Sequence, residues 1–348
     1  MRKLILGCSL SLMSLVASAQ DIHFTQYFSA PLTLNPALAG LIQQDIRLSA
    51  NYRSQWASVS ANPYTTMTAS VDAAILKGKL ADGDALGVGA LMIYDKSGSG
   101  ALTNTTAAFN IAYHKGFGRD KLQHISLGVQ AGMVSKAIDY SNLIFADGIN
   151  TSTGTIITGA TPGVGNINQS LSYMDINVGA MWSGKVNEHT MLYAGTSYNH
   201  VTSPTENFIE NGSHNIHPKT NVYLGGNFNL TDRTTLYTTG LYQTQAKATE
   251  VMVGAAFGYI MNSDRDMEYA RNTIFYMGGF YRHSDAISPY VAIEWAKAKI
   301  GLNYDINGSR FSTATNGMGA LEVSFIYFGN INRYEKAPEY NWSCPKVW

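Results

Sequence analysis

The sequence predicts an all-β fold, an antiparallel transmembrane β-barrel of about 14 strands in the outer membrane of a Gram-negative bacterium. Hydrophobic and polar residues alternate along many segments, which is the period of a strand with two different faces. Charged residues make up only 14% of the chain, whereas a soluble domain averages about 25%. The 24 basic residues balance the 24 acidic residues, so no basic surface points to a nucleic-acid partner.

Residues 1–19 have the layout of a secretory signal peptide: a basic start, an apolar run and small residues before a cleavage site near Ala19. The alternative of a lipoprotein site at Cys8 leaves only four residues after Lys3, too few for the apolar core. Cys8 departs with the signal peptide, so the mature chain keeps Cys344 alone and no internal disulfide is expected. The mature chain is therefore predicted to be exported.

Residues 20–43 precede the first predicted strand and contain an Asn-Pro-Ala turn at 35–37. Pro36 lacks a donor and has a fixed φ, while Asn35 can bond its own backbone, a combination typical of turns. We expect this segment to fold into the barrel lumen as a plug or to lie across the periplasmic mouth. A simple turn at the barrel entrance is an equally good interpretation of the same residues.

The barrel is expected to occupy residues 44–329. In "SYMDINVGAMWSG", the residues Met174, Ile176 and Val178 share one parity, while Asp175 and Asn177 share the other. The predicted strands cover residues 44–56, 63–76, 85–95, 101–115, 123–137, 171–184, 189–202, 217–230, 233–246, 248–262, 273–284, 286–297, 298–308 and 314–328.

The composition of the two faces favours lipid outside the barrel. A soluble sandwich would place Lys, Glu and Arg on its polar face, but here that face mostly carries Asn, Thr, Ser, Gly and Ala. A lumen filled by small polar groups, with the apolar face toward lipid, explains this pattern. Aromatic residues near predicted strand ends fit the interfacial girdles of such barrels: Trp56, Tyr94, Tyr113, Trp182, Tyr259, Trp295 and Tyr327.

Arg53 shares its parity with Gln55 and is predicted to face the lumen, while Trp56 points outward. A buried arginine needs a carboxylate partner. Asp72, on the next predicted strand, is the nearest candidate in the sequence. We therefore expect an Arg53–Asp72 salt bridge with a packing role, in preference to the alternative of a contact with a client protein.

The longest connection, residues 138–170, is rich in Gly, Thr and Asn and is predicted to be an extracellular loop. An even number of strands places the tail, residues 330–348, in the periplasm. Its aromatic side chains are candidates for contact with a partner protein: Tyr334, Tyr340, Trp342 and Trp348. The same side chains would also suit a tail that seals the barrel mouth.

No motif in the sequence predicts catalysis, a cofactor or a metal. "GTSYN" at 195–199 lacks the second Gly of a nucleophile elbow. "HNIH" at 214–217 offers two histidines without further metal ligands nearby. "DGDALGVG" at 82–89 has too few oxygen ligands at the wrong spacing for a calcium loop. We expect neither an enzyme nor a resident cofactor.

The start of the mature chain resembles the PorP/SprF family of outer-membrane proteins associated with the type IX secretion system. The stretch "FTQYFSAPLTLNPALAGLIQQDIRLSANYRSQWASV", followed by "NPYTTMTASVD", carries the resemblance over roughly residues 21 to 76. The tail "NWSCPKVW" resembles the Cys-Pro ending of that family, although Val347-Trp348 replaces its basic-aromatic close. The candidate family-motif residues are Asn35, Pro36, Ala37, Gly40, Arg53, Gln55, Trp56 and Asp72.

The resemblance implies a non-enzymatic barrel that helps a secreting or gliding bacterium to export or retain a particular surface protein, such as an adhesin. Its partners would be that client, periplasmic or outer-membrane secretion components, and membrane lipid. An alternative is a transporter of small hydrophobic molecules, because fatty-acid transporters also carry an Asn-Pro-Ala near their N-terminus. A third possibility, an outer-membrane enzyme, needs a catalytic constellation that the sequence does not offer.

Overall fold

The computed structural model describes residues 21–77, 79–98, 102–118, 120–139, 149–150, 153, 155–156, 169–208, 214–261, 273–309 and 312–330. The predicted signal peptide, most of the long loop at 138–170 and nearly all of the C-terminal tail lie outside the described residues. The candidate contact residues of the tail lie outside them as well: Tyr334, Tyr340, Trp342 and Trp348.

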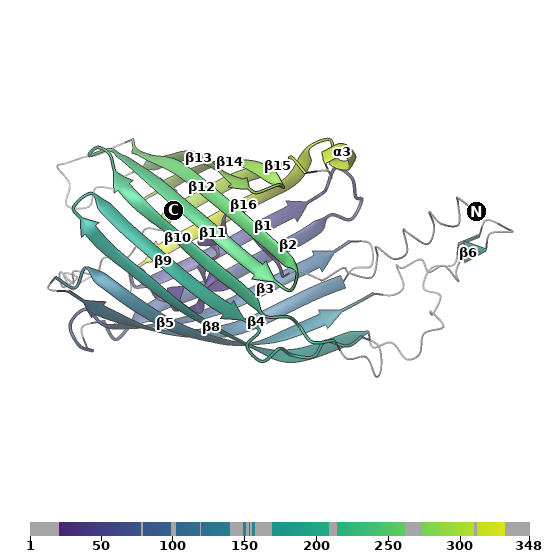
Figure 1. The fold of residues 1–348 in the computed structure, drawn as a ribbon, viewed down its shortest axis with the longest axis horizontal. Coiled ribbons are helices and arrows are strands. Elements are labelled where there is room, and N and C mark those ends of the chain that lie inside the picture. Colours follow the sequence, from purple (N-terminus) through teal and green to yellow (C-terminus); the bar gives the residue numbers. More distant parts are fainter. Residues whose placement is uncertain are drawn as a thin grey trace.

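Within the described residues, 14 antiparallel strands close into one barrel, in which β1 pairs with both β2 and β16 (Figure 1). This confirms the predicted architecture. The barrel strands are β1 (Ile46–Gln55), β2 (Tyr64–Ile75), β3 (Ala85–Ser97), β4 (Leu102–Phe117), β5 (Gln123–Ala137), β8 (Ser170–Asn187), β9 (Thr190–Asn199), β10 (Lys219–Asn229), β11 (Thr234–Gln245), β12 (Ala248–Ile260), β13 (Ile274–Arg282), β14 (Ala286–Trp295), β15 (Ala298–Asn307) and β16 (Met318–Gly329).

The remaining elements are short. β6 (Ile149–Asn150) and β7 (Thr155–Ile156) pair with each other inside the long loop. α3 (Ser312–Thr315) occupies the start of the last predicted strand, so β16 begins later than expected. The N-terminal segment contains η2 (Tyr27–Ser29), α2 (Pro31–Leu34) and η3 (Pro36–Leu38). Among the described residues, the helices are all too short or too polar to cross a membrane.

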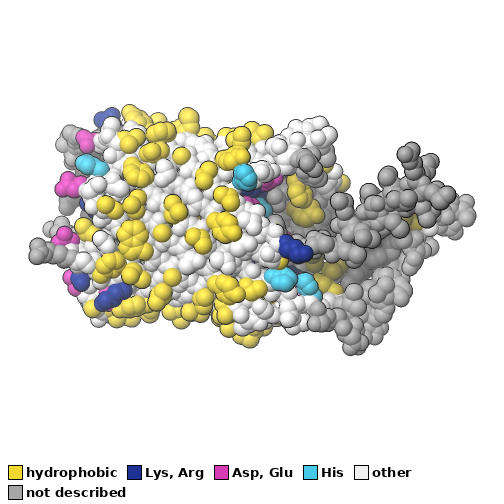
Figure 2. Space-filling view, in the orientation of Figure 1, with side chains coloured by type: hydrophobic (Ala, Val, Ile, Leu, Met, Phe, Trp, Pro, Cys, Tyr) yellow, Lys and Arg dark blue, Asp and Glu magenta, His cyan; other side chains and the backbone are white. Residues whose placement is uncertain are grey.

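The strands turn their apolar parity outward, as predicted. In β10, Leu224 is 62% exposed on the outer surface, while its neighbour Tyr223 is 2% exposed in the lumen. β4 alternates in the same way, with Phe109 and Ile111 exposed and Asn110 buried. On the face shown in Figure 2, hydrophobic side chains cover the barrel wall, and charged side chains gather toward its two ends. This outer surface is suited to lipid.

The lumen differs from the prediction of small polar side chains. Large aromatic residues and ion pairs also point inward, among them the buried Tyr193, Tyr276 and Arg53. The predicted girdle residues mostly lie on the outer surface near strand ends: Tyr94, Tyr113, Tyr259, Trp295 and Tyr327 are exposed there, and Trp56 and Trp182 are half-buried.

The barrel has two rims. We name the end where β1 begins and β16 ends the near rim, and the opposite end the far rim. The two longest connections between barrel strands, residues 138–169 and 200–218, both lie at the far rim. In outer-membrane barrels the long loops are extracellular and the periplasmic turns are short, which would place the near rim in the periplasm.

Candidate functional site

Residues 21–42, which we name the lumen segment, lie inside the barrel and run from the far rim to the near rim. At the far rim, the backbone N–H of Asp21 donates to Oε1 of Gln245 over 2.8 Å. Toward the near rim, the N–H of Gly40 donates to Oδ2 of Asp72 over 2.7 Å. Nearly all side chains of the segment from Phe24 onward are buried. The chain therefore threads its own barrel.

Asn35 fixes the middle of the lumen segment. Its Oδ1 accepts from the N–H of Ala37 over 2.8 Å and so caps η3. Its Nδ2 lies within hydrogen-bond distance of the Ala180 and Thr196 carbonyl oxygens, at 3.1 and 3.0 Å, on the paired strands β8 and β9. The Tyr223 hydroxyl, on β10, is 3.0 Å away. The Asn-Pro-Ala motif thus joins a local turn to three strands of the wall.

Two glycines allow this close approach. Gly179, on β8, faces the turn, and a Cβ at that position would overlap Oδ1 of Asn35 and lie 3.2 Å from Cδ of Pro36. Gly40 ends the motif with a φ of +67°, and a Cβ there would lie 2.6 Å from the Ala73 carbonyl oxygen. The family-motif glycine at 40 is therefore required both by its backbone conformation and by its contact with the wall.

Asp72 does not pair with Arg53, so that prediction was wrong. Asp72 accepts from Nε and Nη2 of Arg47 over 2.9 and 2.8 Å, in addition to the bond from Gly40. The register of β1 and β2 explains the difference, because it sets Arg47 opposite Asp72 and Arg53 opposite Thr66. The paired Arg47 and Asp72 hold the end of the lumen segment at the near rim.

Arg53 instead bonds residues from the last two strands. Closure of the barrel sets it directly opposite Glu322 on β16, and its Nη1 donates to Oε2 of Glu322 over 2.9 Å. Its Nη2 donates to Oδ2 of Asp305 over 2.7 Å, and Nη2 of Arg282 lies 3.2 Å from the same oxygen. All four side chains are buried. Their opposite charges compensate one another, as buried ions require.

This ionic cluster also holds the lumen segment. Glu322 accepts from the consecutive backbone N–H groups of Thr25 and Gln26 over 2.9 and 2.8 Å. The Thr25 hydroxyl donates to Oδ1 of Asp305 over 3.0 Å.

The sequence analysis did not identify three members of this ionic cluster, Glu322, Asp305 and Arg282. One sequence feature does indicate them: each is a charged residue at an inward-facing position of a strand whose other inward-facing residues are mostly uncharged.

A third attachment lies at the far rim, where His200 stands between two carboxylates. Its Nδ1 is 2.9 Å from Oδ1 of Asp175 on β8, and its Nε2 is 2.7 Å from Oδ2 of Asp21. Burial opposes the charged imidazolium, but the bonds to both carboxylates outweigh it and raise the pKa of His200 to about 9. Burial likewise disfavours the Asp21 carboxylate, but His200 and Lys219 hold its pKa well below the usual range.

The remaining motif residues lie at the far rim, outside the lumen segment. Gln55 is half-buried and is the last residue of β1. Trp56 follows it in a turn with a φ of +59°, and its backbone N–H donates to the Gly319 carbonyl over 3.0 Å. The Trp56 ring packs edge-on against Tyr64, with centroids 5.0 Å apart. These two residues therefore shape the first turn between β1 and β2.

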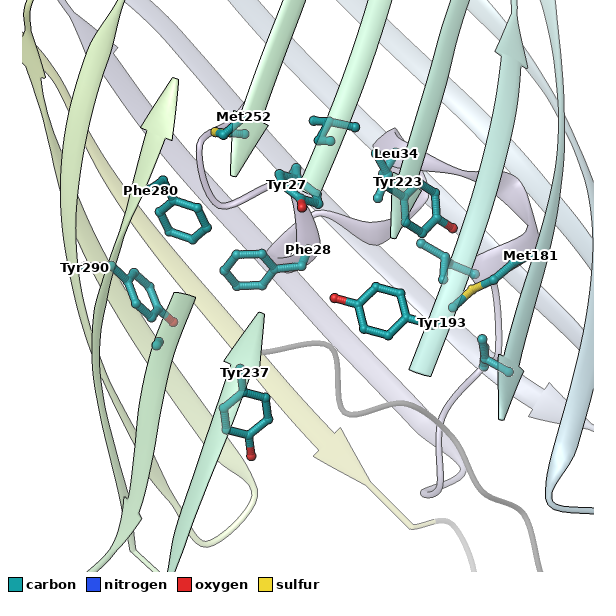
Figure 3. Close-up of a cluster of buried hydrophobic side chains, with 14 of the residues drawn as sticks. Tyr27, Phe28, Leu34, Met181, Tyr193, Tyr223, Tyr237, Met252, Phe280 and Tyr290 are labelled. Atoms are coloured by element: carbon teal, nitrogen blue, oxygen red, sulfur yellow. The ribbon is translucent and has the colours of Figure 1, made fainter. Parts of the chain in front are cut away.

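An aromatic layer surrounds Phe28 in the lumen (Figure 3). The Phe28 ring stacks on Phe280 with centroids 5.8 Å apart and meets Tyr290 edge-on at 6.1 Å. The Tyr27 hydroxyl shares a hydrogen bond with Thr239. Between this layer and the near rim, a cavity of about 360 Å³ remains beside the lumen segment.

No metal site is evident in the part of the chain that the structure describes, where no three His, Cys, Asp or Glu side chains are suitably grouped. His214 and His217, the two histidines of "HNIH", have ring centroids 6.3 Å apart. The carbonyl oxygen of His217 accepts from Nε2 of Gln245 over 3.2 Å, and so supports the attachment of Asp21 at the far rim.

Comparison with known proteins gives one family. The model for the type IX secretion system membrane protein PorP/SprF matches residues 16–327. No curated protein matches the sequence. Among solved structures, the Ralstonia pickettii toluene transporter TbuX is similar, at 12% identity, with 86% of this chain and 94% of that chain covered and a TM-score of 0.48. A Pseudomonas aeruginosa FadL homologue is 10% identical, covering 84% of this chain and 92% of its own, with a TM-score of 0.42.

The close contact at Gly179 predicts that adding one methyl group lowers stability at this position much more than at Gly240. Gly179→Ala should lower the free energy of unfolding by about 1–3 kcal/mol, because the methyl group overlaps Asn35. Gly240→Ala is the matched control, because its Cβ would meet only the Met252 carbonyl oxygen, at 4.0 Å, and should change stability by less than about 0.5 kcal/mol. Denaturant unfolding in detergent measures both. Equal effects would contradict the close packing of Asn35 on β8.

The raised pKa of His200 predicts a pH-dependent attachment at the far rim. A pKa of about 9 in the folded state, above the ordinary 6.5, gives stabilisation that is complete below about pH 6.5 and is lost as the pH rises through 9. Protease cleavage within residues 21–30 should therefore increase between pH 6.5 and 9.5. His200→Gln should remove this rise, whereas His283→Gln, at an exposed position of the same rim, should keep it. A pH-independent wild type would refute the attachment.

Proposed function

Because the chain belongs to the PorP/SprF family of type IX secretion system membrane proteins, we propose that it is a non-enzymatic outer-membrane barrel that helps to export or retain a specific surface protein, such as an adhesin. It acts by binding protein partners at its two rims. No catalytic step is part of this role.

The observation that carries the proposal is the position of the lumen segment. Residues 21–42 pass through the whole barrel and bond wall residues at both rims and in the middle. Thr25, Gln26 and Asn35 are fully buried. A lumen occupied in this way supports a role as a plugged platform. By this term we mean a barrel whose interior is closed by its own chain and whose rims and loops bind the partners.

The two rims suit different partners. The far rim carries the long connections 138–169 and 200–218, and Gly/Thr/Asn-rich loops provide adaptable hydrogen bonds for a secreted client. The near rim, assigned to the periplasm, continues into the tail after Asn330. The aromatic residues of that tail are then the contact for a periplasmic secretion component.

Uptake of small hydrophobic molecules is the second candidate function, and the apolar cavity beside the lumen segment favours it. A transported molecule would have to pass the ionic cluster around Arg53, where the lumen segment is bonded to Glu322 and Asp305. Uptake therefore requires that these bonds break in each cycle. Uptake of a radiolabelled substrate into proteoliposomes distinguishes this function from the first.

If each rim binds its own partner, partner binding at the near rim and client binding at the far rim can be removed by separate mutations. Deleting residues 332–348 should abolish co-purification of the periplasmic component and display of the client, while the barrel still inserts and migrates faster unboiled than boiled on a detergent gel. Replacing residues 157–168 by a Gly/Ser linker of equal length should lose the client but retain the periplasmic component. Surface labelling of the client and pull-down from native membranes measure both effects.

Normal client display by the tail deletion would rule out the tail as a docking element. In that case the tail would be a seal of the barrel mouth or dispensable. Normal display by both variants, with intact barrels, would contradict a role in export of a surface protein through these contacts.

A further inference from the structure

The contacts of the lumen segment follow one direction along the barrel. The backbone N–H of Gln26 donates to Glu322, which lies in the half of β16 that is closer to the far rim. Asn35 bonds the wall midway along β8. The backbone N–H of Gly40 donates to Asp72, which lies toward the near rim. The segment therefore crosses the barrel once, from the far rim to the near rim.

The start of the segment lies at the mouth of the far rim. The side chain of Asp21 is 30% exposed and that of His23 is 23% exposed, whereas Phe24 is 3% exposed. Solvent thus reaches the first residues of the segment, and close packing inside the lumen begins at Phe24.

The same first residues are bonded to both ends of the connection 200–218. His200 is the first residue of that connection, and its Nε2 lies 2.7 Å from Oδ2 of Asp21. Lys219 directly follows the connection, and its Nζ donates to the carbonyl oxygen of Ile22 over 3.3 Å. The start of the segment and the connection therefore form one polar surface, which carries charges of both signs.

The strand order determines the side of the membrane on which this surface lies. An even number of strands places the start of β1 and the end of β16 at the same rim, the near rim. The lumen segment precedes β1 and crosses the barrel, so its start lies at the opposite rim. The long connections assign that rim to the outside of the cell. The start of the segment is then extracellular, although β1 begins in the periplasm.

We propose that the mature N-terminus is exposed at the cell surface beside the connection 200–218, and that the chain reaches it through the lumen of its own barrel. A protein partner at this part of the far rim then contacts the N-terminal residues and the connection together. Because the surface carries charges of both signs, it suits a polar partner of complementary charge. That this partner is a secreted client rests on the proposed function, whereas the position of the N-terminus does not.

The test uses the full chain in intact cells, with both native cysteines replaced by Cys8→Ser and Cys344→Ser. The probe is a polyethylene glycol maleimide too large to cross the outer membrane. Asp21→Cys should react in intact cells to a similar extent as Asn62→Cys, at an exposed position of the far-rim turn between β1 and β2. Gln43→Cys, at an exposed position of the near rim, should react only after the outer membrane is permeabilised.

Cross-linking tests the position beside the connection. A short bis-maleimide should join Asp21→Cys to Thr202→Cys, at an exposed position of the connection, and mass spectrometry of the digested protein identifies the joined peptides. Asn62→Cys is the matched control, because β1 and β10 lie on opposite sides of the closed strand order. It should not be joined to Asp21→Cys.

A cysteine in a short Gly/Ser linker, inserted directly before Asp21, repeats the labelling while keeping the Asp21 side chain. All variants are measured in barrels that migrate faster unboiled than boiled. If both N-terminal thiols react only after permeabilisation while Asn62→Cys reacts in intact cells, the N-terminus is periplasmic and the proposal is wrong. Reaction of Gln43→Cys but not of Asn62→Cys in intact cells would overturn it by reversing the barrel. Joining of Asp21→Cys to Asn62→Cys in place of Thr202→Cys would overturn the position beside the connection.

Discussion

A closed barrel of this circumference encloses more space than its own inward side chains can fill. Eight strands already give an interior that side chains just fill, and the diameter grows with strand number. Here the excess space is occupied by residues 21–42, so the backbone of an irregular segment lies inside the barrel. That segment has donors and acceptors that no neighbouring strand of its own satisfies, and the inward side chains of the wall must supply their partners.

The ion pairs of the lumen follow from this constraint. Glu322 accepts two backbone N–H groups of the lumen segment and at the same time pairs with Arg53 across the β1–β16 seam. Toward the near rim, Asp72 on β2 accepts one backbone N–H of the segment, that of Gly40, and pairs with Arg47 on the neighbouring strand β1. Removal of one member of such a buried pair typically costs about 3–5 kcal/mol. Closure of the barrel and seating of the lumen segment are therefore coupled by the same side chains.

The strands and their outward faces could be predicted because alternation is a local property of the sequence. The partner of Arg53 could not, because it depends on the register between β1 and β16, at opposite ends of the barrel sequence. The contact between Gly179 and Asn35 likewise exists only once the lumen segment is in place. Inward tyrosines such as Tyr193 were also unforeseen, because an aromatic residue in a strand has the same local pattern whether it faces lipid or a packed lumen.

If the protein is a plugged platform, residues 21–42 close its lumen to ions. Ion conductance across a planar lipid bilayer containing the purified full chain tests this most directly. The structure predicts no sustained conductance at neutral pH, because residues 21–42 fill the lumen around the ionic cluster. Stable, ohmic single-channel currents from the full chain would contradict the claim and would indicate an open pore.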